Sequence, residues 1–229
     1  MSEQIKSKER VSEHGEVFTN EREVNAMLDL VKDESERIES RFLEPACGNG
    51  NFVIEILRRK LHTVEEKYKR NKTDFEKYSI IALSSIYGVD ILEDNAKECR
   101  NRLYDFWNKK YSSICKKEAN DDCRKSAKYM INKNILFGDA LTMLRNDGKP
   151  IVFAQWDLVT GNKIKRRDYR LDQLMRDDTN INKNDGQMTL DMYASKDWEY
   201  DTESKAFVPK PIKEYSLVDY WEVYDSYEE

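Results

Sequence analysis

Three short apolar segments of this chain end at or beside a glycine or an acidic residue, and the first two run on into an amphipathic stretch. They are RFLEPA before the glycines at 48 and 50, a segment at 85–91, and KNILFGDAL, which ends at Gly138 and Asp139. The first is followed by Phe52, Ile56 and Leu61 at helical spacing. Strands that alternate with helices predict a mostly parallel sheet, with ligands at the carboxyl ends of the strands.

The same reading divides the chain into three parts. A fourth apolar segment, IVFAQWDLVTGN, is predicted as a further parallel strand that ends at Asn162, after which we expect the sheet to stop. We therefore expect an α/β domain over residues 21–170, with helices on both faces of the sheet. It begins with a helix at 21–38 capped by Asn20, and a charged stretch at 65–79 lengthens the first crossover. Residues 1–20 form an N-terminal arm, and residues 171–229 form an acidic, aromatic-containing appendage without a strong strand.

Composition excludes several classes of protein. No run of about 18 apolar residues is present, and the polar N-terminus lacks the apolar stretch of a secretory signal, so we expect no membrane association and a cytoplasmic location. The four cysteines and two histidines lack the short paired spacing of zinc ligands. The sequence therefore predicts neither a metal site nor a disulfide.

Charge is unevenly distributed along the chain. The net charge is −5, yet residues 96–134 contain eleven Lys or Arg against five Asp or Glu, and residues 163–170 contain five against one. Residues 172–229 reverse this, with six basic and fifteen acidic side chains. A charge distribution of this kind leaves room for a nucleic-acid partner despite the negative total. The acidic end is either a docking segment for another protein or a cap that packs its aromatic residues against the sheet edge.

Polar groups follow three of the predicted strands, where the strand ends would meet. Gly48 and Gly50 allow the backbone to turn tightly and approach a ligand, and the next helix offers its N-terminal amides. A carboxylate at Glu44 suits an ammonium group better than a phosphate. Asp90 stands where dinucleotide-type folds place an acid on ribose hydroxyls, and Asp139 could accept a hydrogen bond from an adenine amino group. Each acid taken singly is also consistent with a helix cap or a solvated strand end. Together they predict S-adenosylmethionine, an adenosine with a cationic tail and no phosphate.

A family resemblance adds to this reading. HGEVFT at 14–19, FLEPACGNGNF, YGVDI and FGDAL resemble, in this order, motifs of the amino-methylating DNA adenine methyltransferases of restriction-modification systems. The resemblance covers residues 10–162. It implies a Rossmann-like class I methyltransferase fold, S-adenosylmethionine as cofactor, double-stranded DNA with a flipped adenine as substrate, and a specificity or endonuclease subunit as partner. The cofactor contacts that it implies are Phe18, Thr19, Glu44, Pro45, Cys47, Gly48, Gly50, Asp90, Ile91, Asp139 and Ala140. The arm that contains Phe18 and Thr19 is expected to close over the methionine end.

The chain departs from this family at its catalytic turn. The family carries Asn-Pro-Pro-Tyr after the fourth strand, where it holds the amino group to be methylated. Asn162 is retained and is the implied catalytic residue, but Lys163, Ile164 and Lys165 replace the prolines and the aromatic residue. The rigid turn and the stacking face are therefore lost. Tyr169 could serve as a substitute aromatic platform or be a surface or core residue, and the neighbouring basic residues could contact DNA phosphates or be solvated.

Three functions agree with these features. The first is an S-adenosylmethionine-dependent methyltransferase that methylates the exocyclic amino group of a flipped adenine. The second is a catalytically impaired module that binds the cofactor and acts as an interaction or regulatory subunit. The third is transfer to another acceptor, such as RNA, protein or a small molecule, because cofactor motifs do not specify the acceptor.

Overall fold

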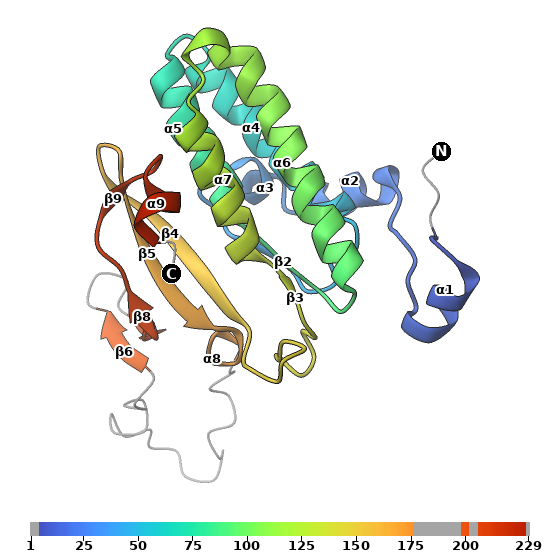
Figure 1. The fold of residues 1–229 in the computed structure, drawn as a ribbon. Helices are drawn as coiled ribbons and strands as arrows, with labels where there is room; N and C mark the ends of the chain where they lie inside the picture. Colours follow the sequence, from blue (N-terminus) through green and yellow to red (C-terminus); the bar gives the residue numbers. More distant parts are fainter. Residues whose placement is uncertain (1–4, 176–197, 202–205, 228–229) are drawn as a thin grey trace.

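The computed structural model describes residues 5–175, 198–201 and 206–227, and Figure 1 shows their arrangement. The first half contains α1 (Lys8–His14), α2 (Glu21–Asp29), α3 (Lys32–Glu36), β1 (Phe42–Glu44), α4 (Asn51–Tyr68), α5 (Lys72–Ser84), β2 (Ile86–Asp90) and α6 (Glu93–Cys115). The second half contains the 3-10 turn η1 (Lys116–Glu118), α7 (Asp121–Asn134), β3 (Ile135–Phe137), β4 (Val152–Thr160), β5 (Lys163–Arg170), α8 (Leu171–Leu174), β6 (Trp198–Asp201), β7 (Ala206–Pro209), β8 (Lys213–Glu214), β9 (Val218–Asp219) and α9 (Val223–Tyr227).

A parallel sheet of order β1-β2-β3 forms the centre of the fold. Phe42 lies opposite Ile86 in the first pair of strands, and Gly88 lies opposite Ile135 in the second. Each crossover contains two long helices, α4 and α5 before β2 and α6 and α7 before β3. The predicted alternation of strand and helix, and with it a mixed α/β fold, is therefore confirmed for the first three strands.

The segment before β1 is a broken helix. Asn20 caps α2 as predicted, because its side chain accepts a hydrogen bond from the Glu23 amide. The helix predicted over 21–38 is interrupted at Leu30 and Val31, and α3 resumes it for five residues. The charged stretch at 65–79 does lengthen the first crossover, and it does so as the end of α4 and the start of α5, where Phe75 is fully buried.

The prediction of a fourth parallel strand is wrong. β4 instead forms an antiparallel hairpin with β5, and the turn between them contains Gly161 and Asn162. Gly161 has φ 56, a left-handed conformation that suits a tight hairpin turn. The sequence KIKRRDYR concealed β5 because its buried alternate positions include Arg166 and Asp168, which are charged.

The hairpin covers part of one face of the parallel sheet. Successive side chains of β2 point to opposite faces, so Tyr87 and Val89 share one face. They pack with Ile151, Phe153 and Leu171, which come from the base of the hairpin and the start of α8. This part of the sheet is therefore covered by β-structure where the sequence predicted a helix.

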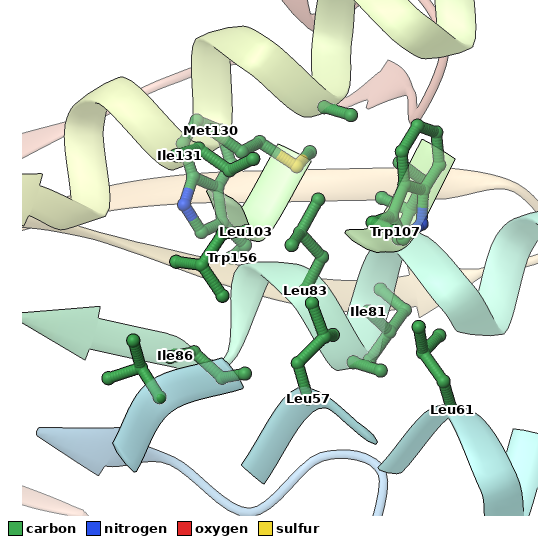
Figure 2. Packing of buried hydrophobic residues seen from close by; sticks show 14 of the residues in the cluster. Leu57, Leu61, Ile81, Leu83, Ile86, Leu103, Trp107, Met130, Ile131 and Trp156 are labelled. Atoms are coloured by element: carbon green, nitrogen blue, oxygen red, sulfur yellow. The ribbon is translucent and has the colours of Figure 1, made fainter. Parts of the chain in front are cut away.

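The main core lies between the four long helices and the hairpin, as Figure 2 shows. Trp107 is fully buried there and donates a hydrogen bond from its indole N–H to Ser79 at 3.1 Å. Trp156 of β4 donates its N–H to Asn134 at the end of α7, at 3.0 Å. These two bonds satisfy the polar atoms of the two largest core side chains, so the core buries both indole groups without an unpaired donor.

The C-terminal segment also enters this core. β8 and β9, two residues each, both pair with β5, whereas the sequence predicted no strong strand beyond residue 171. Tyr220 is fully buried and donates its hydroxyl to Glu76 of α5 at 2.8 Å. Residues 213–227 therefore pack their aromatic side chains against the β5 edge and the helices, the second of the two alternatives considered for this end of the chain.

Candidate functional site

A cavity of about 620 Å³ opens where the three parallel strands end. It is bounded by the loops after β1, β2 and β3 and by the segment between α1 and α2. The predicted cofactor contacts that line it are Phe18, Thr19, Glu44, Pro45, Cys47, Gly48, Asp90, Ile91, Asp139 and Ala140. Gly50 lies behind this surface, and Asn162 does not line the cavity.

The loop between β1 and α4 requires its glycines. Gly48 and Gly50 have φ 53 and 98, a region that side chains with a Cβ rarely adopt. A Cβ at Gly48 would come within 3.2 Å of the Phe18 ring, and one at Gly50 would come within 2.9 Å of the Cys99 sulfur. Because no side chain caps α4 and no acid lies in its first turn, the loop presents the amides of this helix terminus.

Asp90 organises the loops around the cavity. Its side chain is buried; Oδ2 accepts a hydrogen bond from the Gly48 amide and Oδ1 accepts one from the Leu92 amide, both at 2.8 Å. Asn95 donates a further bond to Oδ1 at 3.3 Å. A carboxylate oxygen can accept two hydrogen bonds, so Oδ2 keeps one acceptor position.

Glu44 is the least compensated acid in the cavity. Its only described hydrogen bond comes from the Ala46 amide at 3.2 Å. Burial raises the pKa of Glu44 above its ordinary value, and that single bond opposes the shift only in part. A carboxylate that has lost water and gained one weak partner is well suited to a cationic ligand group.

Asp139 lies at the opposite wall and is held by its own loop. Its Oδ1 accepts a hydrogen bond from the Leu141 amide at 2.8 Å, and its amide donates to the Leu144 carbonyl at 2.8 Å. Leu141 and Ile91 are both largely exposed beside the cavity. Their side chains give this end of the cavity an apolar rim.

The N-terminal arm forms one wall and is attached by charged groups. Phe18 is buried against Gly48, and Glu16 accepts a hydrogen bond from Asn95 at 2.5 Å. Arg10 forms ion pairs with Glu16 at 2.7 Å and with Asp94 at 2.6 Å. The hydrogen bond from Arg10 lowers the pKa of Asp94 to about 2. Asn95 thus joins the arm to Asp90.

The charge of the cavity is one-sided. Four acids line it, namely Glu16, Glu44, Asp90 and Asp139, and no Lys or Arg is present among the described lining residues. A phosphate-bearing ligand such as a dinucleotide would therefore meet repulsion without a compensating cation. A ligand with a positive group and no phosphate is favoured.

Sequence reasoning missed the asparagines of the site. Asn49 lines the cavity, and its Oδ1 is buried without a hydrogen-bond partner among the described residues. Asn51 donates to the Thr19 carbonyl at 3.0 Å and accepts from Arg102 at 3.0 Å, which ties the arm to α4. The signal was available in GNGNF, where polar residues alternate with the glycines of the turn.

Asn162 and Tyr169 lie outside the cavity. Asn162 is in the β4–β5 turn, and its backbone carbonyl accepts a hydrogen bond from the Tyr220 amide at 3.1 Å. Tyr169 pairs with Phe153 within the hairpin, and neither residue lines the cavity. The placement of Asn162 beside the cofactor followed from the parallel fourth strand and is wrong for the same reason: the antiparallel hairpin carries its turn away from the ends of β1, β2 and β3.

The basic residues of β5 are neutralised within the chain. Lys163 pairs with Asp219 at 2.8 Å and Lys165 pairs with Glu214 at 2.5 Å. Arg167 pairs with Asp157 at 2.7 Å. The buried Arg166 forms two hydrogen bonds of 2.7 Å with Asp168. These residues therefore have acidic partners in β4, β5, β8 and β9, and a role in phosphate contact loses its support.

Two buried thiols lie beneath the glycine loop. A hydrogen bond with the Cys99 thiol, together with burial, raises the pKa of the Cys47 thiol. Thiols in such surroundings are poor nucleophiles and metal ligands. Within residues 5–175, 198–201 and 206–227, no three His, Cys, Asp or Glu side chains are grouped so that they could hold a metal ion.

Comparison with known proteins gives no further identification. The chain matches no protein-family model, and neither a curated protein nor a solved structure is significantly similar to it. In the part of the chain that the structure describes, every helix is too short or too polar to span a membrane.

Proposed function

We propose that this chain binds S-adenosylmethionine in the acidic cavity and works as the cofactor-binding part of an adenine-specific DNA methyltransferase with a Rossmann-like fold. The observation that carries the proposal is the combination of a left-handed glycine turn at a helix N-terminus with a lining whose charged residues are all acidic. Glycine turns of this kind usually serve phosphates, and the absence of basic lining residues argues against a phosphate here.

The groups of the cavity match the parts of this cofactor. Glu44 and the unpartnered oxygen of Asn49 would accept from its ammonium group, and the amides at the start of α4 would hold its carboxylate. Asp90 would accept from a ribose hydroxyl at its remaining position, with Asp139 on the adenine amino group. Ile91 and Ala140 would contact the adenine. When bound, the cofactor supplies an electrophilic methyl group on a sulfonium.

The acceptor side of the reaction is less complete. An amine acceptor needs groups that orient it and accept its protons, and Asn162 is held in the hairpin turn away from the cavity. We therefore favour a module that binds the cofactor and depends on a partner subunit for these groups. Methyl transfer by this chain to a flipped adenine in DNA is the second candidate. The exposed Leu141 beside the cavity favours it, because a flipped base can pack against an apolar side chain.

A calorimetric titration with S-adenosylmethionine tests the cofactor proposal, with ATP and NAD as competing ligands. We expect saturable one-to-one binding of S-adenosylmethionine and no binding of the two phosphate-bearing nucleotides. Glu44→Gln should weaken binding roughly 10- to 100-fold, since a hydrogen bond to a charged group contributes about 1.5–3 kcal/mol. Glu39→Gln, at an exposed position outside the cavity lining, is the matched control.

The same titration has a characteristic pH dependence. Because burial raises the pKa of Glu44, the carboxyl is protonated further up the pH scale than an exposed one, and only its ionised form attracts an ammonium group. Affinity should therefore rise with pH through this raised pKa and lose that dependence in Glu44→Gln. Tight binding of ATP, or equal affinity in the Glu44 and Glu39 variants, would contradict the proposal.

A further inference from the structure

The end of the helical bundle opposite the cavity gathers two loops that are distant in sequence. The turn between α4 and α5 and the 3-10 turn after α6 both lie there, as Figure 1 shows. They are joined by an ion pair between Lys72 and Glu118, and the Cys115 thiol approaches the Lys72 carbonyl at 3.9 Å. Before the ends of the two helices, Lys110 of α6 pairs with Glu65 of α4 at 2.8 Å.

Three of the acidic residues around these loops already have a lysine partner. Glu65 and Glu118 are held by the lysines just named, Asp74 pairs with Lys77 at 3.2 Å, and Glu66 lies 3.4 Å from His62. The basic side chains around these loops therefore outnumber the acidic side chains that could pair with them. Six exposed cations here form no ion pair or side-chain hydrogen bond with any described residue: Lys67, Lys69, Arg70, Lys109, Lys116 and Lys117. We call these six residues the basic tip.

A groove of about 790 Å³ between α4 and α6 leads away from the basic tip. Lys109 and Lys110 line it, together with Arg58, whose guanidinium lies 4.8 Å from the centre of the Phe106 ring. Glu36 and Glu65 line the groove as well, and its Arg58, Arg59 and Lys110 pair with Glu55, Asp29 and Glu65. Lys109 is therefore the one lysine or arginine of the described lining that has no ion pair, and it connects the groove to the basic tip.

We propose that the basic tip and this groove bind the phosphate backbone of a nucleic acid. Unpaired lysines and arginines spread over two loops, with Lys109 at the entrance of the groove, can each neutralise a separate phosphate. An acidic protein is the other polyanion to consider, but protein interfaces have an apolar centre. Among the described residues 58–75 and 106–118, none is a large exposed hydrophobic side chain, so the surface lacks such a centre. The chemistry favours the nucleic acid.

This surface is separate from the cavity. α4 begins at the cavity loop and ends at the basic tip, and its 18 residues span roughly 27 Å. A backbone bound at the tip would thus lie several base pairs from any group inside the cavity. The inference does not depend on the cofactor, and its test is made without one.

The test is fluorescence anisotropy of a labelled 30-base-pair DNA duplex of mixed sequence, titrated with the full chain at several salt concentrations. The tip variant combines Lys69→Glu, Arg70→Glu, Lys116→Glu and Lys117→Glu. The control variant makes the same change of net charge at four exposed positions outside the basic tip and the groove: Lys8→Glu, Arg22→Glu, Lys97→Glu and Lys149→Glu. Circular dichroism establishes that each variant is folded.

We expect the tip variant to lose at least tenfold in affinity and the control variant to keep affinity within about threefold. The slope of log affinity against log salt should become shallower by roughly 3.6 in the tip variant, at about 0.9 for each of four lost phosphate contacts. If the tip variant does not fold, the neutral pair Lys67→Gln and Lys109→Gln should still weaken binding about threefold or more. Equal loss in tip and control variants, or polyglutamate competing as well as DNA at equal charge, would overturn the proposal.

Discussion

Glu44 and Asp90 lie in one cavity but in different electrostatic surroundings. Asp90 accepts three hydrogen bonds from the chain itself, whereas Glu44 accepts one at 3.2 Å and has a raised pKa. A buried carboxylate with several donors is a structural anchor as well as a ligand group. Asp90 therefore mainly stabilises the loops around the cavity. Substitution of Glu44 is the better test of whether the ligand carries a positive charge.

This distinction predicts how substitution of Asp90 will act. Asp90→Ala leaves the amides of Gly48 and Leu92 without their acceptor, so we expect it to lower the free energy of unfolding by about 2–4 kcal/mol as well as to weaken cofactor binding. Asp139→Ala removes one bond within an exposed loop and should cost less than about 1 kcal/mol. Urea unfolding of both variants measures the difference. Equal costs would show that Asp90 does not anchor the loop.

A buried lysine offers a second test at this scale. Lys60 has no exposed surface and donates to the Ile38 carbonyl at 3.1 Å, to the Ser40 carbonyl and to the Ser85 hydroxyl at 2.6 Å. Lys60→Met keeps the apolar stem but removes a donor from three acceptors, of which the Ile38 carbonyl retains a bond of 3.3 Å from the Ser85 hydroxyl. We therefore expect a loss of about 1–3 kcal/mol. Thermal unfolding at pH 7 measures it, with Lys67→Met on the exposed side of α4 as the control.

The pH dependence of the unfolding free energy tests the charge of Lys60 separately from its packing. Burial lowers the pKa of Lys60 to about 7, below the ordinary 10.5, so the unfolded chain binds the proton more readily between these two values. Unfolding free energy should therefore rise with pH over this window in the wild type. Lys60→Met should remove that rise. A profile unchanged by the substitution would contradict the lowered pKa.

Among the elements, the β4–β5 hairpin separates what the sequence predicts from what it conceals. The glycine loop, the acids at the strand ends and the capped helix α2 follow from local pattern, because each depends on residues close together in sequence. β5 does not, since its inward positions carry Arg166 and Asp168, whose opposite charges pair with each other. β8 and β9 are two residues each and depend on the existing β5 edge. Strands this short have no periodic pattern of apolar residues by which the sequence could predict them.

The hairpin also determines what restoring the family turn should do. Replacing Lys163, Ile164 and Lys165 by Pro, Pro and Tyr would place prolines in a strand paired on both sides, at a fully buried isoleucine. Because proline cannot donate to a ladder, we expect loss of several kcal/mol and no gain of methyl transfer. Differential scanning calorimetry and a tritiated-methyl transfer assay on DNA measure the two effects. A stable, active variant would contradict the antiparallel hairpin.

At the scale of the whole molecule, the helices and the C-terminal segment share one core. Tyr220 and Val223 are fully buried in the cluster that also contains Val24 and Phe75. Glu76 accepts hydrogen bonds from both Tyr220 and Tyr111, so a buried carboxylate joins α5, α6 and the C-terminal segment. The described part of the C-terminal segment therefore belongs to the core of the domain.

This arrangement predicts a large effect from a single late residue. Tyr220→Ala removes a fully buried ring and one of two donors to Glu76, and we expect it to cost about 3–5 kcal/mol. Leu217→Ala, at a half-exposed neighbour, should cost less than about 1 kcal/mol. Guanidinium unfolding followed by tryptophan fluorescence compares them. A small effect at Tyr220 would mean that the helical core is complete without this segment.

The Glu76–Tyr220 bond has a consequence for how fast the chain can fold. It connects residues 144 positions apart, whereas β1, β2 and β3 pair with partners that lie much nearer in sequence. Contacts of long sequence separation form slowly, because the loop they close must first lose its entropy. Refolding should therefore assemble the cavity half early and join the C-terminal segment to the core last, and until that step Glu76 has only the Tyr111 hydroxyl as a tyrosine donor.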